Sequence, residues 1–217
     1  MMIVQGDFLV KGAEASIYTG FFLQSSVIIK QRLPKTYRMQ QLDQTIRLQR
    51  LRAEARIMTS AWKIGIQVPV LLGINIDDQS LLIEEIPGEL LFTVMSSTTR
   101  IALETIFESV GQQVGLLHEN DLIHGDLTVF NIIIGENNTP WLIDFGLGQV
   151  SVEMERKADD LLTFYNTLKA ISSDFQVLFE AFQVGYNKEY SKGRKTIEHT
   201  KKIQSRARYI LPEERLE

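Results

Sequence analysis

The sequence predicts an α+β fold in which a small sheet-rich part precedes a larger helical part. Short apolar and alternating runs fill most of the chain up to residue 86, and short polar or glycine-containing turns separate them. One long helical pattern, from Met39 to Lys63, interrupts these runs. After Pro87-Gly88, which breaks the chain, apolar residues recur mostly at helical spacing.

The composition of the 217 residues narrows the classes of function. With 44% hydrophobic residues the chain can bury a core, as one compact domain or two small lobes. No segment approaches 18 uninterrupted apolar residues and the N-terminus has no signal-like pattern, so we expect no membrane partner and a cytoplasmic protein. The absence of cysteine excludes disulfides, thiol catalysis and cysteine-based zinc sites.

The first two predicted strands cover residues 2–10 and 15–22. The turn Lys11-Gly12-Ala13-Glu14-Ala15 joins them, and its small residues would let backbone N–H groups approach phosphate groups. The turn holds a single glycine, however, so a plain hairpin turn is an equally good interpretation. A third strand is predicted at Ser26–Lys30.

Lys30 ends an apolar strand, where an unpaired ammonium group would be costly. The helix predicted for residues 39–63 offers a counter-charge, because Leu51, Glu54 and Met58 fall on one face. We therefore expect Glu54 to face the sheet and pair with Lys30 rather than to be an ordinary surface residue. Two more strands, predicted at Pro69–Leu72 and Ser80–Ile86, bring the sheet to five strands.

Two polar motifs lie in the second half of the chain. A helix predicted for residues 100–119 leads into His124-Gly125-Asp126-Leu127-Thr128-Val129-Phe130-Asn131, and a predicted β-hairpin then leads into Asp144-Phe145-Gly146. They match H-x-D-x-x-x-x-N and D-F-G, the two loops of a phosphoryl-transfer centre. Either motif alone arises by chance, but this order, with Asp144 13 positions after Asn131, indicates one shared site.

Phosphoryl transfer gives each polar residue of these motifs a role. Asp126 would orient or deprotonate the nucleophile, while Asn131 and Asp144 hold Mg²⁺ against the phosphates of ATP. Lys30, supported by Glu54, would orient the α- and β-phosphates. The further residues that we expect near the nucleotide are Lys11, Gly12, Ala13, Glu14 and Ala15 in the first turn, and Glu84 and Ile86, whose backbone would face adenine.

These roles predict a minimal protein-kinase-like bilobal fold that binds ATP between its lobes. Residues 1–86 would form the five-stranded N-lobe, and residues 87–217 the helical C-lobe of the same domain. Only Leu147–Val152 separates Gly146 from a helix predicted to begin near Glu153, so the long activation segment of ordinary protein kinases is absent.

Three further residues bear on how the site would work. Thr128 stands where many protein kinases have a lysine, so we expect slow transfer. Asp160, in the helix after the D-F-G motif, either accepts N–H bonds from the catalytic loop or lies at the surface. We expect His124 to brace the loop by hydrogen bonds rather than to titrate during catalysis.

Basic residues concentrate near the C-terminus. Seven lie between Lys192 and Arg208, against one acidic residue, Glu198, although the whole chain carries a net charge of −4. This asymmetry indicates an anionic partner for a basic tail, whereas the simpler alternative is a solvated helix with a disordered end.

With these residues assembled, the chain resembles the PRPK family, the small atypical kinase subunit of the KEOPS complex. The resemblance covers nearly the whole chain, and it looks archaeal. Val129-Phe130 depart from the small polar residues usual before the asparagine. The matching segments are the Lys11–Ala15 turn, Lys30–Arg38 (K-Q-R-L-P-K-T-Y-R), Leu42-Asp43, Arg52–Arg56, the H-G-D-L-T loop and Ser205–Tyr209.

The resemblance implies an atypical Ser/Thr protein kinase that autophosphorylates and hydrolyses ATP. It also implies a place in threonylcarbamoyladenosine modification of tRNA. The partners that it implies are the threonylcarbamoyl-transferase subunit, against the C-lobe and basic tail, and a small KEOPS subunit on the N-lobe, with tRNA as a further partner.

Three alternatives compete with this prediction. A RIO-type kinase should carry S-T-G-K-E in the first turn and no D-F-G, and this chain shows the reverse. A small-molecule kinase of the aminoglycoside type would need a larger helical C-lobe. A pseudokinase scaffold would have no need to keep the four polar residues Lys30, Asp126, Asn131 and Asp144 together.

Overall fold

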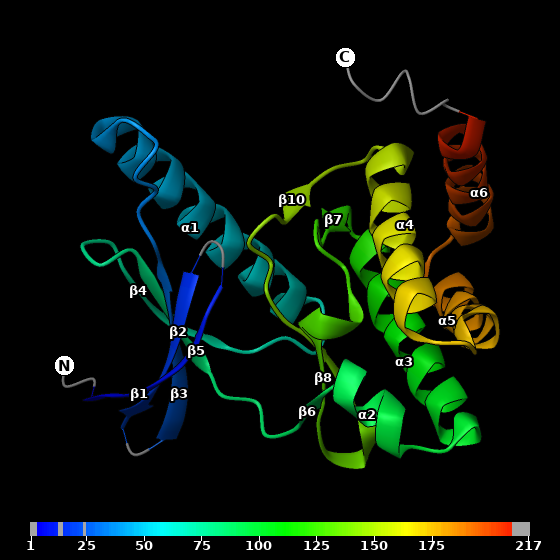
Figure 1. The fold of residues 1–217 in the computed structure, drawn as a ribbon, viewed down its shortest axis with the longest axis horizontal. Coiled ribbons are helices and arrows are strands. Elements are labelled where there is room, and N and C mark those ends of the chain that lie inside the picture. Colours follow the sequence, from blue (N-terminus) through cyan, green and yellow to red (C-terminus); the bar gives the residue numbers. More distant parts are fainter. Residues whose placement is uncertain (1–3, 13–14, 24, 210–217) are drawn as a thin grey trace.

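The computed structural model describes residues 4–12, 15–23 and 25–209. Its first part is an antiparallel sheet in the order β1-β2-β3-β5-β4, with one long helix beside it (Figure 1). The α+β class and the five-stranded sheet predicted from the sequence are confirmed. The elements are β1 Val4–Lys11, β2 Ala15–Phe22, β3 Ser25–Arg32, α1 Gln40–Lys63, β4 Leu71–Asn75 and β5 Ser80–Glu84.

Helix α1 packs one face against the rest of the molecule. The side chains of Leu51, Ile57 and Met58 are buried on that face, and Glu54 is buried among them. A charged side chain at such a position needs a partner, because burial removes its hydration. The helical periodicity therefore predicted correctly which way Glu54 points.

The second part is mainly helical and extends from Glu89 onward (Figure 1). Two short sheets accompany its helices, in the orders β6-β8-β9 and β10-β7. The elements are β6 Glu89–Leu90, α2 Leu91–Ser97, α3 Arg100–Glu119, β7 Leu122–Ile123, β8 Ile132–Ile134, β9 Pro140–Leu142, β10 Gln149–Val150, α4 Met154–Ile171, α5 Phe175–Glu189 and α6 Gly193–Tyr209. The predicted boundary between residues 86 and 87 falls between these two parts and stays a prediction.

Helices α3 and α5 cross closely at the centre of the helical part. Around the crossing lie the aromatic rings of Phe107, Phe164, Phe182 and Tyr186, all buried, and Phe182 stacks on Tyr186 with centroids 5.9 Å apart. Dense packing of large rings makes this region the rigid support of the loops that lead out of α3 and into α4.

The chain between the D-F-G motif and α4 is short, as the sequence predicts. It passes through β10, which pairs with β7, and the Ser151 N–H donates to the carbonyl of Asp121 at 2.8 Å. Helix α4 begins at Met154. The minimal fold without an activation segment is therefore confirmed.

Most of the basic tail forms helix α6, which packs on α4 (Figure 1). Thr196, Ile197 and Thr200 are buried on its inner face. The two arginines nearest its end, Arg206 and Arg208, have side chains outside the described set. Within the described residues, no helix is long and apolar enough to cross a membrane.

Candidate active site

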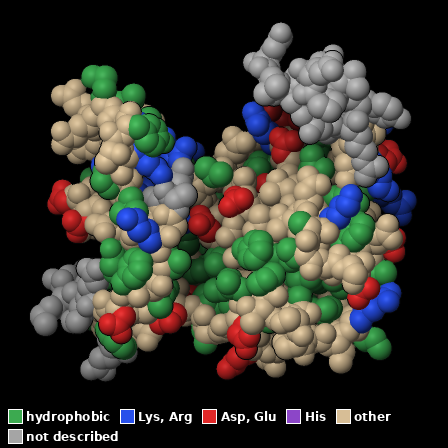
Figure 2. Space-filling view, in the orientation of Figure 1, with side chains coloured by type: hydrophobic (Ala, Val, Ile, Leu, Met, Phe, Trp, Pro, Cys, Tyr) green, Lys and Arg blue, Asp and Glu red, His purple; other side chains and the backbone are tan. Residues whose placement is uncertain are grey.

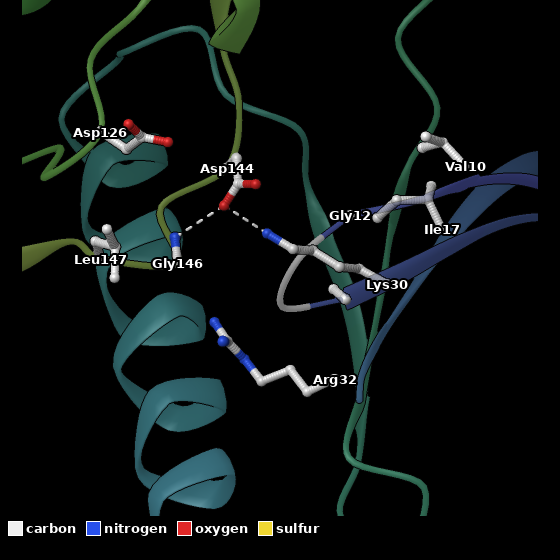
Figure 3. A pocket seen from close by; sticks show the side chains of 10 residues that line it. Val10, Gly12, Ile17, Lys30, Arg32, Asp126, Asp144, Gly146 and Leu147 are labelled. Atoms are coloured by element: carbon white, nitrogen blue, oxygen red, sulfur yellow. Dashed lines mark hydrogen bonds and ion pairs between the residues drawn. The ribbon is translucent and has the colours of Figure 1, made fainter. Parts of the chain in front are cut away.

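A cavity of about 360 Å³ lies between the sheet and the helical part. The space-filling view shows the hollow between the two halves, with acidic side chains on its rim (Figure 2). The close view shows that polar groups from both halves line it (Figure 3). Its lining residues are Val10, Gly12, Ala15, Ile17, Lys30, Arg32, Asp126, Asp144, Gly146 and Leu147.

Lys30 projects from β3 and contacts two carboxylates. Its Nζ lies 2.6 Å from Oε1 of Glu54 and 2.6 Å from Oδ1 of Asp144. Burial alone would lower the pKa of Lys30, but the two carboxylates outweigh it and raise the pKa above its ordinary value. The expected pair of Lys30 and Glu54 is present, and the D-F-G aspartate joins it.

Asp144 adopts a left-handed backbone conformation, with φ of 62°. Its Oδ1 accepts a bond from the Gly146 N–H at 3.1 Å as well as from Lys30. Burial would raise the pKa of Asp144, but Lys30 and this N–H lower it below its ordinary value. The carboxylate is thus held ionised, and its side chain is 45% exposed toward the cavity.

Asn131 and Asp126 are joined across the catalytic loop. The Asn131 amide donates to the carbonyl of Asp126 at 2.8 Å and to its carboxylate Oδ2 at 3.0 Å. Since both bonds use the NH₂ group, the amide oxygen of Asn131 is directed away from Asp126. Asp126 itself lines the cavity (Figure 3).

His124 braces the two motifs against each other. The Asp126 N–H donates to its Nδ1 at 3.3 Å, so Nε2 carries the proton and donates to the carbonyl of Ile143 at 3.0 Å. Burial lowers the pKa of His124, although Asp160, Asp144 and Asp126 oppose the shift. The ring is therefore neutral in the folded protein, in agreement with the expected bracing role.

This neutral ring makes stability depend on pH. His124 would have its ordinary pKa of 6.5 in the unfolded chain and a lower one in the folded protein. As pH falls through the unfolded value, the unfolded chain binds a proton that the folded protein does not, so stability is lost toward acid. Between pH values of about 7.5 and 5.5, wild type should lose about 1 kcal/mol more free energy of unfolding than His124→Gln. Urea denaturation at both pH values measures this, and equal losses would contradict the assignment.

Asp160, on α4, holds the catalytic loop by accepting hydrogen bonds from two of its backbone N–H groups. Its Oδ2 accepts from the His124 N–H at 2.7 Å, and its Oδ1 accepts from the Gly125 N–H at 2.8 Å. Oδ2 also lies 3.2 Å from Nε2 of His118, whose Nδ1 lies 2.7 Å from the Tyr186 hydroxyl. Of the two sequence interpretations of Asp160, the structure therefore supports the loop-holding one.

Gly125 is required by the backbone at this point. It has a φ of +82°, and a Cβ added there would lie 2.2 Å from the carbonyl oxygen of Leu147. Neither the conformation nor the space admits a side chain. The catalytic loop and the segment after Gly146 are thus in direct backbone contact.

The residues expected around the nucleotide are only partly gathered. Gly12 and Ala15 line the cavity, Lys11 is exposed outside the lining, and Ala13 and Glu14 lie outside the described residues. Glu84 and Ile86 line a different hollow, shared with Trp141. The N–H of Glu84 donates to the carbonyl of Val70 at 2.9 Å. Their contact with adenine stays a prediction.

The sequence analysis missed Arg32 as a site residue. Its guanidinium pairs with Oε2 of Glu54, and its side chain is 3% exposed. The signal was available, because side chains two positions apart on a strand share a face, so Arg32 had to point the same way as Lys30.

Oxygen atoms of the site suit a magnesium ion held jointly with phosphates. The described residues contain no group of three or more His, Cys, Asp or Glu side chains arranged for a metal ion. Asn131 and Asp144 offer one amide and one carboxylate oxygen, and Mg²⁺ is typically held by one or two protein groups with water and substrate phosphates. This donor set therefore fits Mg²⁺ bound together with a nucleotide.

Comparisons with known proteins agree with this geometry. The RIO domain family matches residues 28–184. A "Probable bifunctional tRNA threonylcarbamoyladenosine biosynthesis protein" of Methanosphaera stadtmanae is 36% identical over 201 residues, 92% of this chain and 36% of that protein. A "Probable serine/threonine-protein kinase BUD32 homolog" of Archaeoglobus fulgidus is 32% identical over 199 residues, 92% of this chain and 94% of that protein.

A protein of Methanocaldococcus jannaschii with the same bifunctional name is also 36% identical over 201 residues. The chain spans about a third (36%) of the length of these bifunctional relatives. The prediction that the chain is not of the RIO type was wrong. It depended on the Lys11–Ala15 turn and the D-F-G motif, whereas the RIO match begins at residue 28, after that turn, and includes the D-F-G motif.

Proposed function

This chain belongs to the RIO-domain family and to the small atypical kinases of the PRPK type, and from that premise we propose that it transfers the γ-phosphoryl group of Mg-ATP. The acceptors are Ser or Thr hydroxyl groups, its own included, or water. The observation that carries the proposal is the meeting of Lys30, Asp126 and Asp144 around one cavity, from three distant parts of the chain.

Each of these residues has a task that its contacts support. Bound ATP with Mg²⁺ supplies the phosphoryl group and a charge that offsets the phosphates. Lys30 would turn from Asp144 to the α- and β-phosphates, and Asp144 with the amide oxygen of Asn131 would hold the metal ion. Asp126, fixed by Asn131 at 3.0 Å, orients the attacking hydroxyl group and accepts its proton.

The nature of the acceptor follows from what the site lacks. The chain between Gly146 and α4 is too short to form a docking platform for a peptide. Thr128 supplies no cation near the γ-phosphate. The missing platform favours water or a hydroxyl group presented by a bound partner over free peptides. The missing cation favours slow turnover.

We further propose that this activity supports threonylcarbamoyladenosine modification of tRNA. The names of the relatives and the greater length of the bifunctional ones support a second activity working beside this chain. The partners would be a threonylcarbamoyl transferase, against the C-lobe and the basic helix α6, and a small KEOPS subunit on the N-lobe. The exposed Lys192, Arg194 and Lys195 at the start of α6 would suit a tRNA phosphate backbone.

Turnover of radiolabelled ATP tests the proposed function. Wild type and Asp126→Ala would be compared for released phosphate and for label on protein, with and without the transferase and tRNA. We expect Asp126→Ala to lose turnover by about a hundredfold or more, and the partners to raise wild-type hydrolysis. Turnover by Asp126→Ala equal to that of wild type would overturn the proposal. Label confined to the chain itself, unaffected by the partners, would retain the kinase and remove the tRNA-linked role.

A further inference from the structure

Two cations of strand β3, Lys30 and Arg32, both pair with the carboxylate of Glu54. Lys30 and Arg32 lie on the same face of β3, and Glu54 reaches them from α1. Oε1 of Glu54 lies 2.6 Å from Nζ of Lys30, and Oε2 pairs with the guanidinium of Arg32. Glu54 and Arg32 are both buried, so this charge cluster is shielded from water.

The two cations are not equivalent. Lys30 is shared with Asp144, and the proposed function requires it to turn toward the nucleotide phosphates. A lysine is a point charge on a flexible stem, while the planar guanidinium of Arg32 is a rigid fork with a permanent charge. Arg32 is thus the better suited of the two to hold Glu54 throughout a catalytic cycle.

The backbone of Arg32 adds a second connection to α1. Its N–H donates to the carbonyl of Gln79 at 3.1 Å, which fixes this end of β3. Its carbonyl accepts from Nη1 of Arg47 at 3.4 Å, and Arg47 in turn pairs with Asp43 in the first turn of α1 at 2.7 Å. Arg32 therefore contacts α1 at Arg47 and again two turns later at Glu54.

Ordinary protein kinases control the position of the corresponding helix through the activation segment, because the Lys–Glu ion pair must be in place for transfer. Here only residues 147–153 lie between the D-F-G motif and the start of α4. We propose that Arg32 is the positioning residue that performs this task. It fixes Glu54, and through Glu54 it fixes α1, so that Glu54 stays in place beside Lys30 when Lys30 turns from Asp144 to the phosphates.

One competing role for Arg32 is direct contact with phosphate. Arg32 lines the cavity, and a Cβ added at Gly146 would lie 3.3 Å from its Nη2. Figure 3 shows the guanidinium directed toward α1 and Gly146, below the line from Lys30 to Asp144. Because that Nη2 is already bonded to Glu54, the geometry favours action through Glu54.

Hydrogen exchange without nucleotide tests the positioning role. The amides of residues 51–58 in α1 would be followed in wild type, Arg32→Met and Lys30→Met. The matched control is Arg56→Met, an exposed arginine on the same helix. We expect Arg32→Met to speed exchange of these α1 amides about tenfold or more and to leave the α3 amides unchanged. Lys30→Met and the control should each change exchange in α1 by less than about threefold.

Unchanged exchange in Arg32→Met, or an equal increase in Lys30→Met, would overturn the proposal. If Arg32→Met does not fold, Arg32→Lys takes its place, and it should show a smaller increase that is still above that of the control. The movement of Lys30 toward the phosphates rests on the proposed function, but the hydrogen-exchange result does not. An absence of ATP turnover would therefore remove the function and leave the positioning of α1 to be decided by exchange.

A double-mutant cycle separates the two roles of Arg32 in turnover. If Arg32 acts through Glu54, Arg32→Met lowers kcat about tenfold or more and leaves KM for ATP within about twofold of wild type. In a Glu54→Gln background the same substitution should change kcat by less than about twofold. If Arg32 instead contacts phosphate, KM rises and the two losses multiply, and that result would overturn the proposal.

Discussion

Replacing Asp144 with asparagine is expected to remove Mg-ATP turnover by about a thousandfold or more while the protein stays folded. The substitution removes the only carboxylate proposed as a metal ligand. It also removes one of the two carboxylates that pair with Lys30, so Lys30 keeps only its contact with Glu54 when no nucleotide is bound. Asparagine suits the left-handed conformation that Asp144 adopts, with φ of 62°, so backbone strain should not confuse the result.

The measurement is steady-state hydrolysis of ATP at saturating Mg²⁺, together with circular dichroism of both proteins. Asp159→Asn is the matched control, because Asp159 is an exposed carboxylate on α4. Its turnover should equal that of wild type. If Asp144→Asn kept turnover within about tenfold of wild type, the metal role of Asp144 would have to be abandoned.

Replacing Gly185 with alanine is expected to destabilise the protein by about 3 kcal/mol or more. At the α3–α5 crossing, a Cβ on Gly185 would lie 1.8 Å from the carbonyl oxygen of Glu108. A Cβ on Gly111, on the facing helix, would lie 2.0 Å from the carbonyl oxygen of Phe182. Both obstacles are backbone atoms of packed helices, so the methyl group can be accommodated only by moving the helices apart.

Urea denaturation of wild type and Gly185→Ala measures this loss as a lower midpoint at unchanged slope. Gly73→Ala is the control, since the nearest atom to a Cβ there is in ordinary contact at 3.8 Å. A loss below about 1 kcal/mol for Gly185→Ala would show that α3 and α5 are not as closely packed as the structure has them.

Local order along the chain was enough to predict which polar residues of the candidate site lie together. The spacing of His124, Asp126 and Asn131 lies within one loop, and Asp144 follows a hairpin that holds both motifs together. The direction of Glu54 follows from helical periodicity, and the position of Lys30 from a single strand. These predictions succeed because covalent geometry over a few residues decides them.

Only the tertiary structure decided which further groups hold these residues in place. Asp160 reaches the loop from 35 and 36 positions away, and His118 meets Tyr186 across 68. Strand periodicity gives the direction of Arg32, but its contact with Glu54 depends on how α1 packs beside the sheet. The close approach of α3 and α5 depends on Gly111 and Gly185. No local pattern specifies such contacts, because they depend on how whole elements pack, and packing sums many weak interactions over the molecule.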